Sequence, residues 1–418
     1  MKNDQSKIIT EKLRKHIGSL IEDSHYVRII AIDKAPYLDA FIRGESFPPF
    51  EIEIQPSSKC NLKCKWCIGE EIQARNQVMN LPDIINADNI GRIVEGILET
   101  RQNGLGVEIV KFSGFIGEPL SRKEAVLSAI QRLACACVKV GMFTNGVLMT
   151  EDTWEILANI SYVHVSLDSG PRSFSWCKEN KSPDNPHSTK TFDLILDNIR
   201  GLDRQRKKTG WRKDLKINVG YVVINENYDE IYETSRLVRD AGADSIRFKY
   251  DITGGGYELF KAGTHNEAFS QIERAHADFH NPPEFSVSSI HSRDDLENNK
   301  FANWKCSDGC YYQHFTSTIG SDGNVYICDH NTMLNATTFG NAITRPFSEI
   351  WDSKLRRYSI NGTSKICKCS VCPPFGRRVN AFLSEIVDYR ERYGIEVVVS
   401  ALELLRNEYK TVNRGGGW

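Results

Sequence analysis

The sequence contains no long apolar run. No segment of its 418 residues approaches the roughly 18 consecutive apolar residues that a membrane-spanning helix requires. The N-terminal stretch MKNDQSKIITEKLRKHIG also lacks the apolar core of a secretory signal peptide. We therefore predict no contact with a membrane, and we expect the protein to remain in the cytoplasm.

An excess of charge of either sign is also absent. The chain has 53 Lys and Arg against 54 Asp and Glu, for a formal net charge of -1. Nucleic-acid-binding proteins usually carry a basic excess, so we predict no nucleic-acid partner. The sequence has no internal repeat and no low-complexity segment. Its length predicts one large domain with a smaller appendage.

Cysteine, by contrast, is plentiful. The chain has 12 cysteines, of which three fall at Cys60, Cys64 and Cys67 and six fall between Cys306 and Cys372. In a reducing compartment disulfides are disfavoured, and clustered cysteines more often bind metal. The split into two groups therefore predicts two metal-bearing modules.

Short β-rich segments alternate with amphipathic segments from residue 50 onward. This alternation is typical of a parallel sheet built from repeated βα units. Six strands are predicted, at residues 50–55, 107–113, 138–144, 162–168, 216–223 and 245–250. They predict an α/β fold with a partial (β/α)6 TIM-like barrel, in which the chemistry gathers on loops at the C-terminal ends of the strands.

Helix signals and glycines divide the chain further. Residues 90–98 have helical apolar spacing, Ser121 and Glu124 form a capping-box pattern, and Asp229 and Gly242 bracket another helix. The glycine run at 254–256 predicts a boundary. The expected units are an N-terminal helical or β extension (1–49), the barrel (50–252), a connecting segment (253–300), a small Cys-rich α+β domain (301–378) and C-terminal helices with a tail (379–418).

The first cysteine group directly follows the first predicted strand. Cys60-x3-Cys64-x2-Cys67 places three thiolates on one loop, which leaves one corner of a 4Fe-4S cube without a protein ligand. Thiolates are the ligands that such clusters require, and an open iron can bind a small molecule. A structural zinc loop is the alternative, but zinc normally takes a fourth nearby Cys or His, and none follows within this loop.

This motif, CNLKCKWC with aromatic Trp66 before the last cysteine, resembles the hallmark of the radical S-adenosylmethionine (radical SAM) superfamily. The resemblance covers about residues 50–250. It implies one 4Fe-4S cluster on Cys60, Cys64 and Cys67 that cleaves SAM reductively to a 5'-deoxyadenosyl radical. Trp66 would then be a packing or stacking surface for the nucleoside, although it could instead be a core residue.

Three later motifs extend the resemblance. GEPL, with Gly117 and Glu118, is similar to the family's acidic motif, in which Glu118 would accept a hydrogen bond from the SAM amino group. Asn145 in FTNG, with Ser166 and Asp168 in VSLD, would line the nucleoside and methionine moieties. Without the resemblance, Glu118 could be a helix-start acid, Asn145 a turn residue, and Ser166 and Asp168 strand-end caps. The family's usual glycine pair reads Ile116-Gly117 here.

The second cysteine group is built around a predicted hairpin. Cys310, Gly323 and Cys328 form C-x12-G-x4-C across the turn signal Asp322-Gly323, and Cys367-x-Cys369-x2-Cys372 follows. This resembles the SPASM or twitch extensions of radical SAM enzymes and implies one auxiliary 4Fe-4S cluster, because the further C-x5-C-x3-C pattern of two-cluster modules is missing after Cys372. By the twitch pattern the ligands would be Cys310, Cys328, Cys369 and Cys372, with Cys306 or Cys367 as possible replacements. A four-cysteine zinc site is the alternative.

Other candidates stand outside the motifs. Cys177 lies in a segment rich in Pro, Ser and Asn, which predicts a loop near the cavity mouth; its thiol could donate a hydrogen atom or could be an incidental surface group. Cys135 and Cys137 are expected to be buried. Arg247 and Lys249 alternate with apolar residues, so both point to one face; inward they could bind a carboxylate or hydroxyls, and outward they would be solvated.

The resemblance implies a radical SAM enzyme of oxidoreductase type that takes electrons from a flavodoxin- or ferredoxin-type donor. We expect a small-molecule substrate, such as a sugar, aminocyclitol or amino acid, and a net oxidation or epimerisation in natural-product biosynthesis. The alternative is a maturase that forms a crosslink or epimer in a ribosomally made peptide. Such maturases often have a winged-helix leader-binding domain, and 59 residues before Cys60 are few for one.

Overall fold

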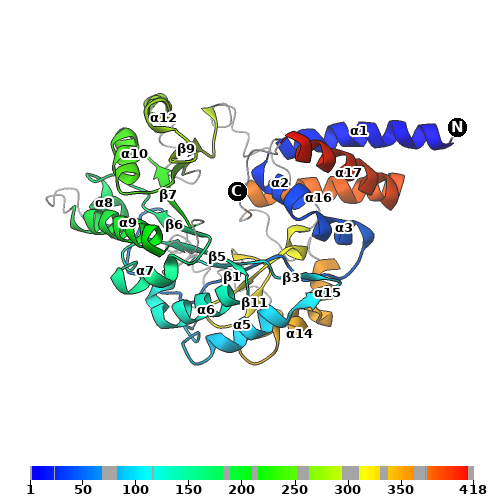
Figure 1. Ribbon diagram of the computed structural model, residues 1–418, viewed down its shortest axis with the longest axis horizontal. Coiled ribbons are helices and arrows are strands. Elements are labelled where there is room, and N and C mark those ends of the chain that lie inside the picture. Colours follow the sequence, from blue (N-terminus) through cyan, green and yellow to red (C-terminus); the bar gives the residue numbers. More distant parts are fainter. Residues whose placement is uncertain are drawn as a thin grey trace.

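A single mixed sheet forms the centre of the computed structural model. The structure describes residues 2–22, 24–67, 82–114, 117–181, 189–209, 215–251, 263–293, 310–329, 338–361, 372 and 374–412. The sheet has nine strands in the order β11-β10-β1-β4-β5-β6-β7-β8-β9 (Figure 1). They are β1 (Glu51–Ile54), β4 (Ile109–Phe112), β5 (Lys139–Thr144), β6 (Tyr162–Ser166), β7 (Lys216–Val223), β8 (Ser245–Tyr250), β9 (Ser286–Ser289), β10 (Thr316–Ile319) and β11 (Val325–Tyr326). All six predicted strands are present, and within this sheet the strands in the order β1-β4-β5-β6-β7-β8-β9 run parallel.

Helices cover the outer face of this sheet, as in a partial (β/α) barrel (Figure 1). They are α5 (Ile90–Glu99), α6 (Lys123–Cys135), α7 (Glu151–Leu157), α8 (Phe174–Glu179), α9 (Lys190–Thr209), α10 (Ile231–Asp240) and α12 (His265–Phe279), with short 3-10 turns η2 (Pro119–Arg122) and η3 (Tyr228–Glu230). Apolar strand residues such as Val110, Val163 and Ile246 face these helices and are fully buried. The predicted capping box is wrong, because Ser121 lies within η2 and its hydroxyl donates to the Lys59 carbonyl at 3.4 Å.

The inner face of the sheet is polar. On β1, Ile52 and Ile54 are fully buried on the helical side, whereas Glu51 and Glu53 alternate with them and face the other way. Lys111 on β4 pairs with Glu51, with 2.7 Å between Nζ and Oε1. A barrel wall of this kind can hold polar groups that a sealed apolar core could not.

The Cys-rich C-terminal segment joins the same sheet. Strand β10 pairs in parallel with β1, so that Thr318 lies opposite Glu53, and β11 turns back antiparallel to β10. The predicted hairpin at Asp322-Gly323 is confirmed. Gly323 has φ 74°, and a Cβ there would lie 2.6 Å from Ile343 Cδ1, so both conformation and space favour glycine.

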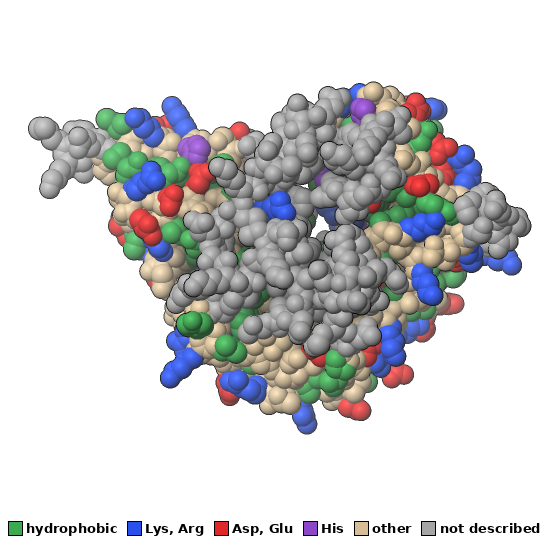
Figure 2. Space-filling model, turned by 180° about the vertical axis from the view of Figure 1, so that it is seen from behind, with side chains coloured by type: hydrophobic (Ala, Val, Ile, Leu, Met, Phe, Trp, Pro, Cys, Tyr) green, Lys and Arg blue, Asp and Glu red, His purple; other side chains and the backbone are tan. Residues whose placement is uncertain are grey.

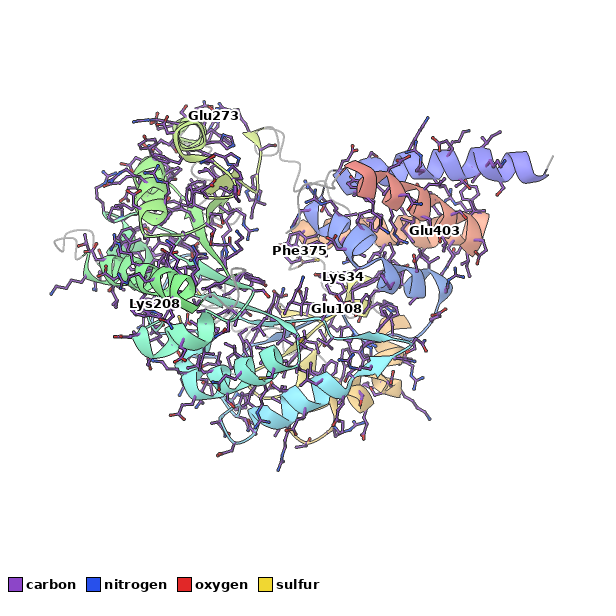
Figure 3. The ribbon with its side chains drawn as sticks, in the orientation of Figure 1. Lys34, Glu108, Lys208, Glu273, Phe375 and Glu403 are labelled. Atoms are coloured by element: carbon purple, nitrogen blue, oxygen red, sulfur yellow. The ribbon has the colours of Figure 1, made fainter. Side chains whose placement is uncertain are left out.

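Helices from both ends of the chain form a second core beside the barrel (Figure 1). They are α1 (Lys2–Glu22), α2 (His25–Arg28), the π-helical turn η1 (Ile29–Asp33), α3 (Ala35–Arg43), α16 (Pro374–Tyr393) and α17 (Ile395–Val412). Arg406 of α17 binds Asp39 of α3, with 2.9 Å between Nη1 and Oδ1. Lys34 pairs with Glu108 just before β4 and so ties this bundle to the barrel (Figure 3). The described N-terminal extension is therefore helical.

The remaining described elements are short. They are β2 (Arg101–Gln102), β3 (Leu105–Gly106), η4 (Tyr312–His314), α14 (Phe347–Trp351) and α15 (Lys354–Asn361). Among the described residues, no helix combines the length and apolar character that a bilayer crossing requires. Acidic and basic side chains are interspersed over the face in Figure 2, in keeping with the balanced net charge.

Candidate cofactor site

The first cysteine loop lies at the C-terminal end of β1 and is held by α8. The backbone N–H groups of Lys63 and Lys65 donate to the carbonyls of Lys178 and Cys177, both at 3.0 Å. Within the loop, the Leu62 N–H donates to Cys60 Sγ at 3.5 Å. Donors that point at a sulfur stabilise a thiolate, which is the form that binds iron. The loop is thus held through its backbone, and the sulfur of Cys60 accepts a hydrogen bond.

A buried ion pair lies next to this loop. Lys178 Nζ is 2.9 Å from Asp168 Oδ2, and the two side chains are only 3% and 7% exposed. Burial alone would lower the pKa of Lys178, but Asp168 and the Cys64 thiol, to which it also hydrogen-bonds, raise it above its ordinary value. Burial would likewise raise the pKa of Asp168, but Lys178 and Lys249 lower it. Both groups are therefore charged, with the cation beside Cys64.

Asp168 also has an unsatisfied oxygen. Its backbone lies in the left-handed region at φ 57°, which is uncommon for a residue with a side chain, and its N–H donates to the Gly220 carbonyl at 2.9 Å. Within the described residues, the buried Oδ1 has no hydrogen-bond partner. A buried acceptor without a donor costs free energy, so this atom is suited to a donor on a bound ligand.

Glu118 connects the loops after β4 and β5. Its Oε1 accepts from the Thr144 hydroxyl at 2.7 Å and the Leu120 N–H at 3.2 Å, and its Oε2 accepts from the Asn145 N–H at 2.8 Å. Burial raises the pKa of Glu118, and these donors oppose the shift. Its own N–H donates to the Lys59 carbonyl at 2.8 Å, which places it directly against the cysteine loop.

Asn145 and Gly117 bring the same loops onto the cysteines. Asn145 Nδ2 donates to Asn61 Oδ1 at 2.7 Å and lies 3.8 Å from Cys60 Sγ. A Cβ at Gly117 would lie 2.0 Å from the Ser57 carbonyl oxygen, so this close approach requires glycine. The structure thus brings the predicted residues of these two motifs to the cysteine loop, while Ile116 lies outside the described residues.

Cys177 differs from its prediction. The expected loop contains helix α8, and the Cys177 side chain is fully buried against Trp66, Trp176 and Val222. Burial raises the pKa of its thiol to about 12. The expected exposure is wrong, and with it the argument for a hydrogen-atom donor at the cavity mouth. Trp66 is partly buried in this cluster and packs beside the cysteine loop.

Cys135 and Cys137 were predicted to be buried, and this is wrong as well. Both are exposed, because Cys135 ends α6 and Cys137 follows it in a left-handed turn at φ 59°. Arg247 and Lys249 lie on the inner face, because Ile246, Phe248 and Tyr250 of the same strand are buried on the helical side. Of the two predicted orientations, the structure therefore shows the inward one for Arg247 and Lys249.

Three of the second-group cysteines can be placed. Asn380 Nδ2 of α16 lies 3.7 Å from Cys310 Sγ, and Arg377 of the same helix donates to the Cys372 carbonyl at 3.0 Å. Cys328 follows β11 and is partly exposed. Cys306, Cys367 and Cys369 lie outside the described residues. Among the residues that are described, no three Cys, His, Asp or Glu side chains converge on one metal-ion position.

Sequence reasoning missed two contributors to the site. Lys178 is a lone lysine ten residues after Asp168, and nothing in its local pattern distinguishes it from a solvated one. Asp83 accepts from the Ser58 N–H at 2.7 Å and from the Ser57 hydroxyl at 2.9 Å, and so braces the start of the cysteine loop. Its role depends on a contact across 25 residues, which no short motif records.

Comparison with known proteins identifies this arrangement. Residues 54–238 match the Radical SAM superfamily, and residues 310–373 match SPASM, an iron-sulfur cluster-binding domain. The chain contains a radical SAM domain and an SPASM domain. The radical SAM region and the SPASM region together imply a SAM-binding 4Fe-4S cluster, an auxiliary iron-sulfur cluster and SAM as cofactors.

Relatives of this radical SAM chain vary in name. A probable GTP 3',8-cyclase of Methanococcus vannielii is 34% identical over 128 residues, which are 30% of this chain and 38% of that protein. A tungsten-containing aldehyde ferredoxin oxidoreductase cofactor-modifying protein of Pyrococcus furiosus is 23% identical over 332 residues, which are 72% of this chain and 80% of that protein. This chain thus aligns with well under two thirds of the first relative and with most of the second.

Solved structures share the radical SAM fold. Streptococcus suis SuiB bound to S-adenosylmethionine has a TM-score of 0.52 and 18% identity, over 79% of this chain and 70% of that chain. SuiB bound to precursor peptide SuiA has a TM-score of 0.51 and 17% identity, over 82% and 74% of the two chains. The α/β barrel with a Cys-rich C-terminal region, predicted from sequence, is confirmed.

The residues present fit the implied cofactor. The loop supplies three thiols, as a cube with one open iron requires. Beside them lie a buried carboxylate, Glu118, and an unpartnered carboxylate oxygen, Asp168 Oδ1. SAM offers an ammonium group and ribose hydroxyls, which are the hydrogen-bond donors that such acceptors take.

Proposed function

We propose that this radical SAM enzyme abstracts a hydrogen atom from a polar small molecule held on the inner face of the barrel. The observation that carries the proposal is the buried Lys178–Asp168 pair beside Cys64, with Asp168 Oδ1 left for a ligand. Cys60, Cys64 and Cys67 would hold a 4Fe-4S cluster, which when reduced would supply the one electron that cleaves SAM to methionine and a 5'-deoxyadenosyl radical.

The surrounding residues bind and orient the cofactor. In our proposal Glu118 accepts a hydrogen bond from the SAM ammonium group, since its carboxylate is already fixed by Thr144 and Asn145. Asp168 Oδ1 accepts from a ribose hydroxyl. Lys178 holds the Asp168 carboxylate in place, and its charge near Cys64 favours the more negative, reduced state of whatever the thiolates bind.

The proposed SAM pocket also includes Ser166, Asn145 and Gly117. Trp66 packs against Cys177 beside the cysteine loop and would support the pocket there. Ser166 lies at the inward-facing end of β6, and its carbonyl accepts from Lys178 Nζ at 2.8 Å. Cys310, Cys328, Cys369 and Cys372 remain our proposed ligands of one auxiliary cluster, with Cys306 and Cys367 as replacements. That cluster would be the acceptor of the second electron in a net oxidation.

The polar inner face supports a compact, polar substrate. Ser113 donates to Glu53 Oε1 at 2.5 Å, and Lys111 lies between Glu51 and Glu53. Such ordered donors and acceptors fix a hydroxylated or amino-bearing molecule better than an apolar one. A sugar, an aminocyclitol or an amino acid has these groups, and oxidation or epimerisation at a carbon that bears one of them is the outcome we propose.

A peptide substrate is the second candidate. SuiB, which shares the fold, has been solved with a precursor peptide. The described residues before β1 are helices packed against α16 and α17, and no strand of a winged-helix domain occurs among them. Several relatives are named GTP 3',8-cyclase, after a cyclisation. An oxidoreductase reaction is therefore part of what we propose for this enzyme.

One labelling experiment distinguishes the two substrates. Extract from cells of the source organism grown in deuterated medium is incubated with reduced enzyme and unlabelled SAM, and 5'-deoxyadenosine is analysed by mass spectrometry. We expect deuterium in 5'-deoxyadenosine from the low-molecular-weight fraction, unchanged by protease treatment of the extract. Deuterium transfer that protease abolishes would instead establish the peptide substrate. Transfer from neither fraction would contradict hydrogen abstraction.

A further inference from the structure

Two cations on the inner face of β8 form no ion pair with any residue that the structure describes. Arg247 is partly exposed and Lys249 is exposed, and the two alternate with buried Ile246 and Phe248. Within the described residues, neither side chain forms an ion pair or a hydrogen bond. A partly desolvated cation is costly without a counter-charge, so partly buried Arg247 is suited to an anionic partner.

The positions of these cations relate them to the cofactor site. Strand register aligns Ser166 of β6 with Gly220 of β7, and Gly220 with Arg247 of β8. Neighbouring strands are about 4.8 Å apart, so Arg247 lies about 10 Å from Ser166 along this row. Lys249 is close enough to Asp168 to lower the pKa of that carboxyl. The two cations therefore face the space next to the proposed SAM pocket.

The positive charge of Arg247 lowers the pKa of two neighbouring histidines, which are therefore uncharged at neutral pH. His164 of β6 is buried, its ring lies over Gly220, and its pKa falls to about 3 because of burial, Arg247 and Lys249. On α2 the pKa of His25 is lowered by burial, then by Arg28 and Arg247, and only Asp33 opposes this. Asp168, the carboxyl whose pKa Lys249 affects, is already paired with Lys178.

The charge differs across the barrel interior. The opposite flank of the barrel interior has the reverse charge, because Glu51 and Glu53 share the single cation Lys111. An anionic group is repelled from that flank and attracted to β8, so the two flanks would orient a substrate in one direction.

We propose that Arg247 and Lys249 bind an anionic group, a carboxylate or a phosphate, on the substrate. The planar guanidinium of Arg247 matches two oxygens of either group, and the ammonium of Lys249 adds a third donor. The proposal rests on the proposed function, since it names the substrate class of the same barrel. Its consequence is that a bound anion holds the rest of the substrate along the row toward Ser166.

Fluorine NMR with two small anions tests this directly. Iron-loaded enzyme with SAM is titrated with trifluoroacetate, which represents a carboxylate, and with monofluorophosphate, which represents a phosphate. We expect saturable binding of at least one, weakened about tenfold or more in Arg247→Gln and in Lys249→Gln, because a charge-assisted hydrogen bond is lost. Arg247→Lys should retain part of the affinity. The anion that binds more tightly shows whether the anionic group of the substrate is a carboxylate or a phosphate.

Lys208→Gln is the matched control. Lys208 is an exposed lysine on the outer helix α9, which points away from the barrel (Figure 3), and its loss should leave anion binding unchanged. Folding of each variant is checked by iron content and circular dichroism. Arg247 and Lys249 are replaced one at a time, because a single substitution of a side chain that is at least partly exposed seldom prevents folding.

Absence of binding of both anions to the wild type overturns the inference, as does equal binding by wild type, Arg247→Gln and Lys249→Gln. The proposed function is measured separately, as 5'-deoxyadenosine formation by the wild type. Loss of that product with retained anion binding would overturn the proposed function and leave the anion site in place.

Discussion

Lys178 Nζ lies 2.9 Å from Asp168 Oδ2 in a contact from which water is almost excluded. The two residues are separated by the turn between β6 and α8, and α8 in turn binds the cysteine loop through its carbonyls. One helix therefore positions the thiols and the ion pair together. This explains how a loop of three cysteines and a strand-end carboxylate come to share one site.

Breaking the pair should be costly. Lys178→Met leaves the Asp168 carboxylate buried without its counter-charge, and such a loss typically destabilises a protein by about 3 to 5 kcal/mol. Adding Asp168→Asn should recover much of this stability, because the uncompensated charge is gone, but SAM binding should stay weak. Urea unfolding of the iron-loaded variants and equilibrium SAM titration measure the two effects. A single Lys178→Met variant as stable as wild type would contradict the pairing.

Glu118→Gln should weaken SAM binding. The substitution keeps the shape of the side chain and removes its charge, so a charge-assisted hydrogen bond to the SAM ammonium group, worth about 1.5 to 3 kcal/mol, is lost. Titration calorimetry on the reconstituted enzyme measures the change. Glu124→Gln, an exposed acid in the first turn of α6, is the control and should bind SAM normally. Unchanged affinity in Glu118→Gln would assign the ammonium contact elsewhere.

Iron content tests the count of clusters. Two 4Fe-4S clusters require about eight irons per chain in reconstituted enzyme. Replacing Cys60, Cys64 and Cys67 by Ala should leave about four, bound by the C-terminal cysteines. Metal analysis of both proteins provides the comparison. Full iron in the triple variant, or zinc as the dominant metal in the C-terminal module, would contradict the two-cluster assignment.

His314 makes a separate prediction about acid stability. Its ring packs on Phe41 at 5.1 Å between centroids, and burial and Arg356 lower its pKa to about 3. Because the unfolded state takes up a proton near the ordinary pKa of 6.5 and the folded state does not, stability falls as pH falls from about 6.5 to about 3. At pH 5 the loss should be about 2 kcal/mol. His314→Gln should lack it, as urea midpoints at pH 7 and pH 5 would reveal. Equal pH dependence in the two proteins would remove His314 as the cause.

Local patterns predicted the parts of the fold that local chemistry determines. The six strands alternate or concentrate β-branched residues, and a turn such as Asp322-Gly323 fixes its own geometry. The pairing of β10 with β1 joins residues more than 260 positions apart, and the bundle joins both chain ends. No local pattern contains those contacts, so the pairing of the C-terminal segment with the barrel sheet was not predicted.

The site divides in the same way. Cys60, Cys64, Glu118 and Asn145 were predicted because they belong to motifs with fixed spacing. Lys178 was missed and Cys177 was misjudged for one reason: the composition around them is that of a loop, whereas the fold buries both in a short helix under the cysteine loop. Burial, which decides whether a thiol is reactive or a lysine is solvated, depends on packing that composition does not report.

Formation of 5'-deoxyadenosine tests the central claim most directly. Reconstituted enzyme is reduced under anaerobic conditions with SAM, and the product is measured by chromatography and mass spectrometry beside a variant with Cys60, Cys64 and Cys67 replaced by Ala. The account predicts 5'-deoxyadenosine and methionine from the wild type, even slowly without substrate, and none from the variant. No product from wild type that carries its full iron, or equal product from both proteins, would contradict it.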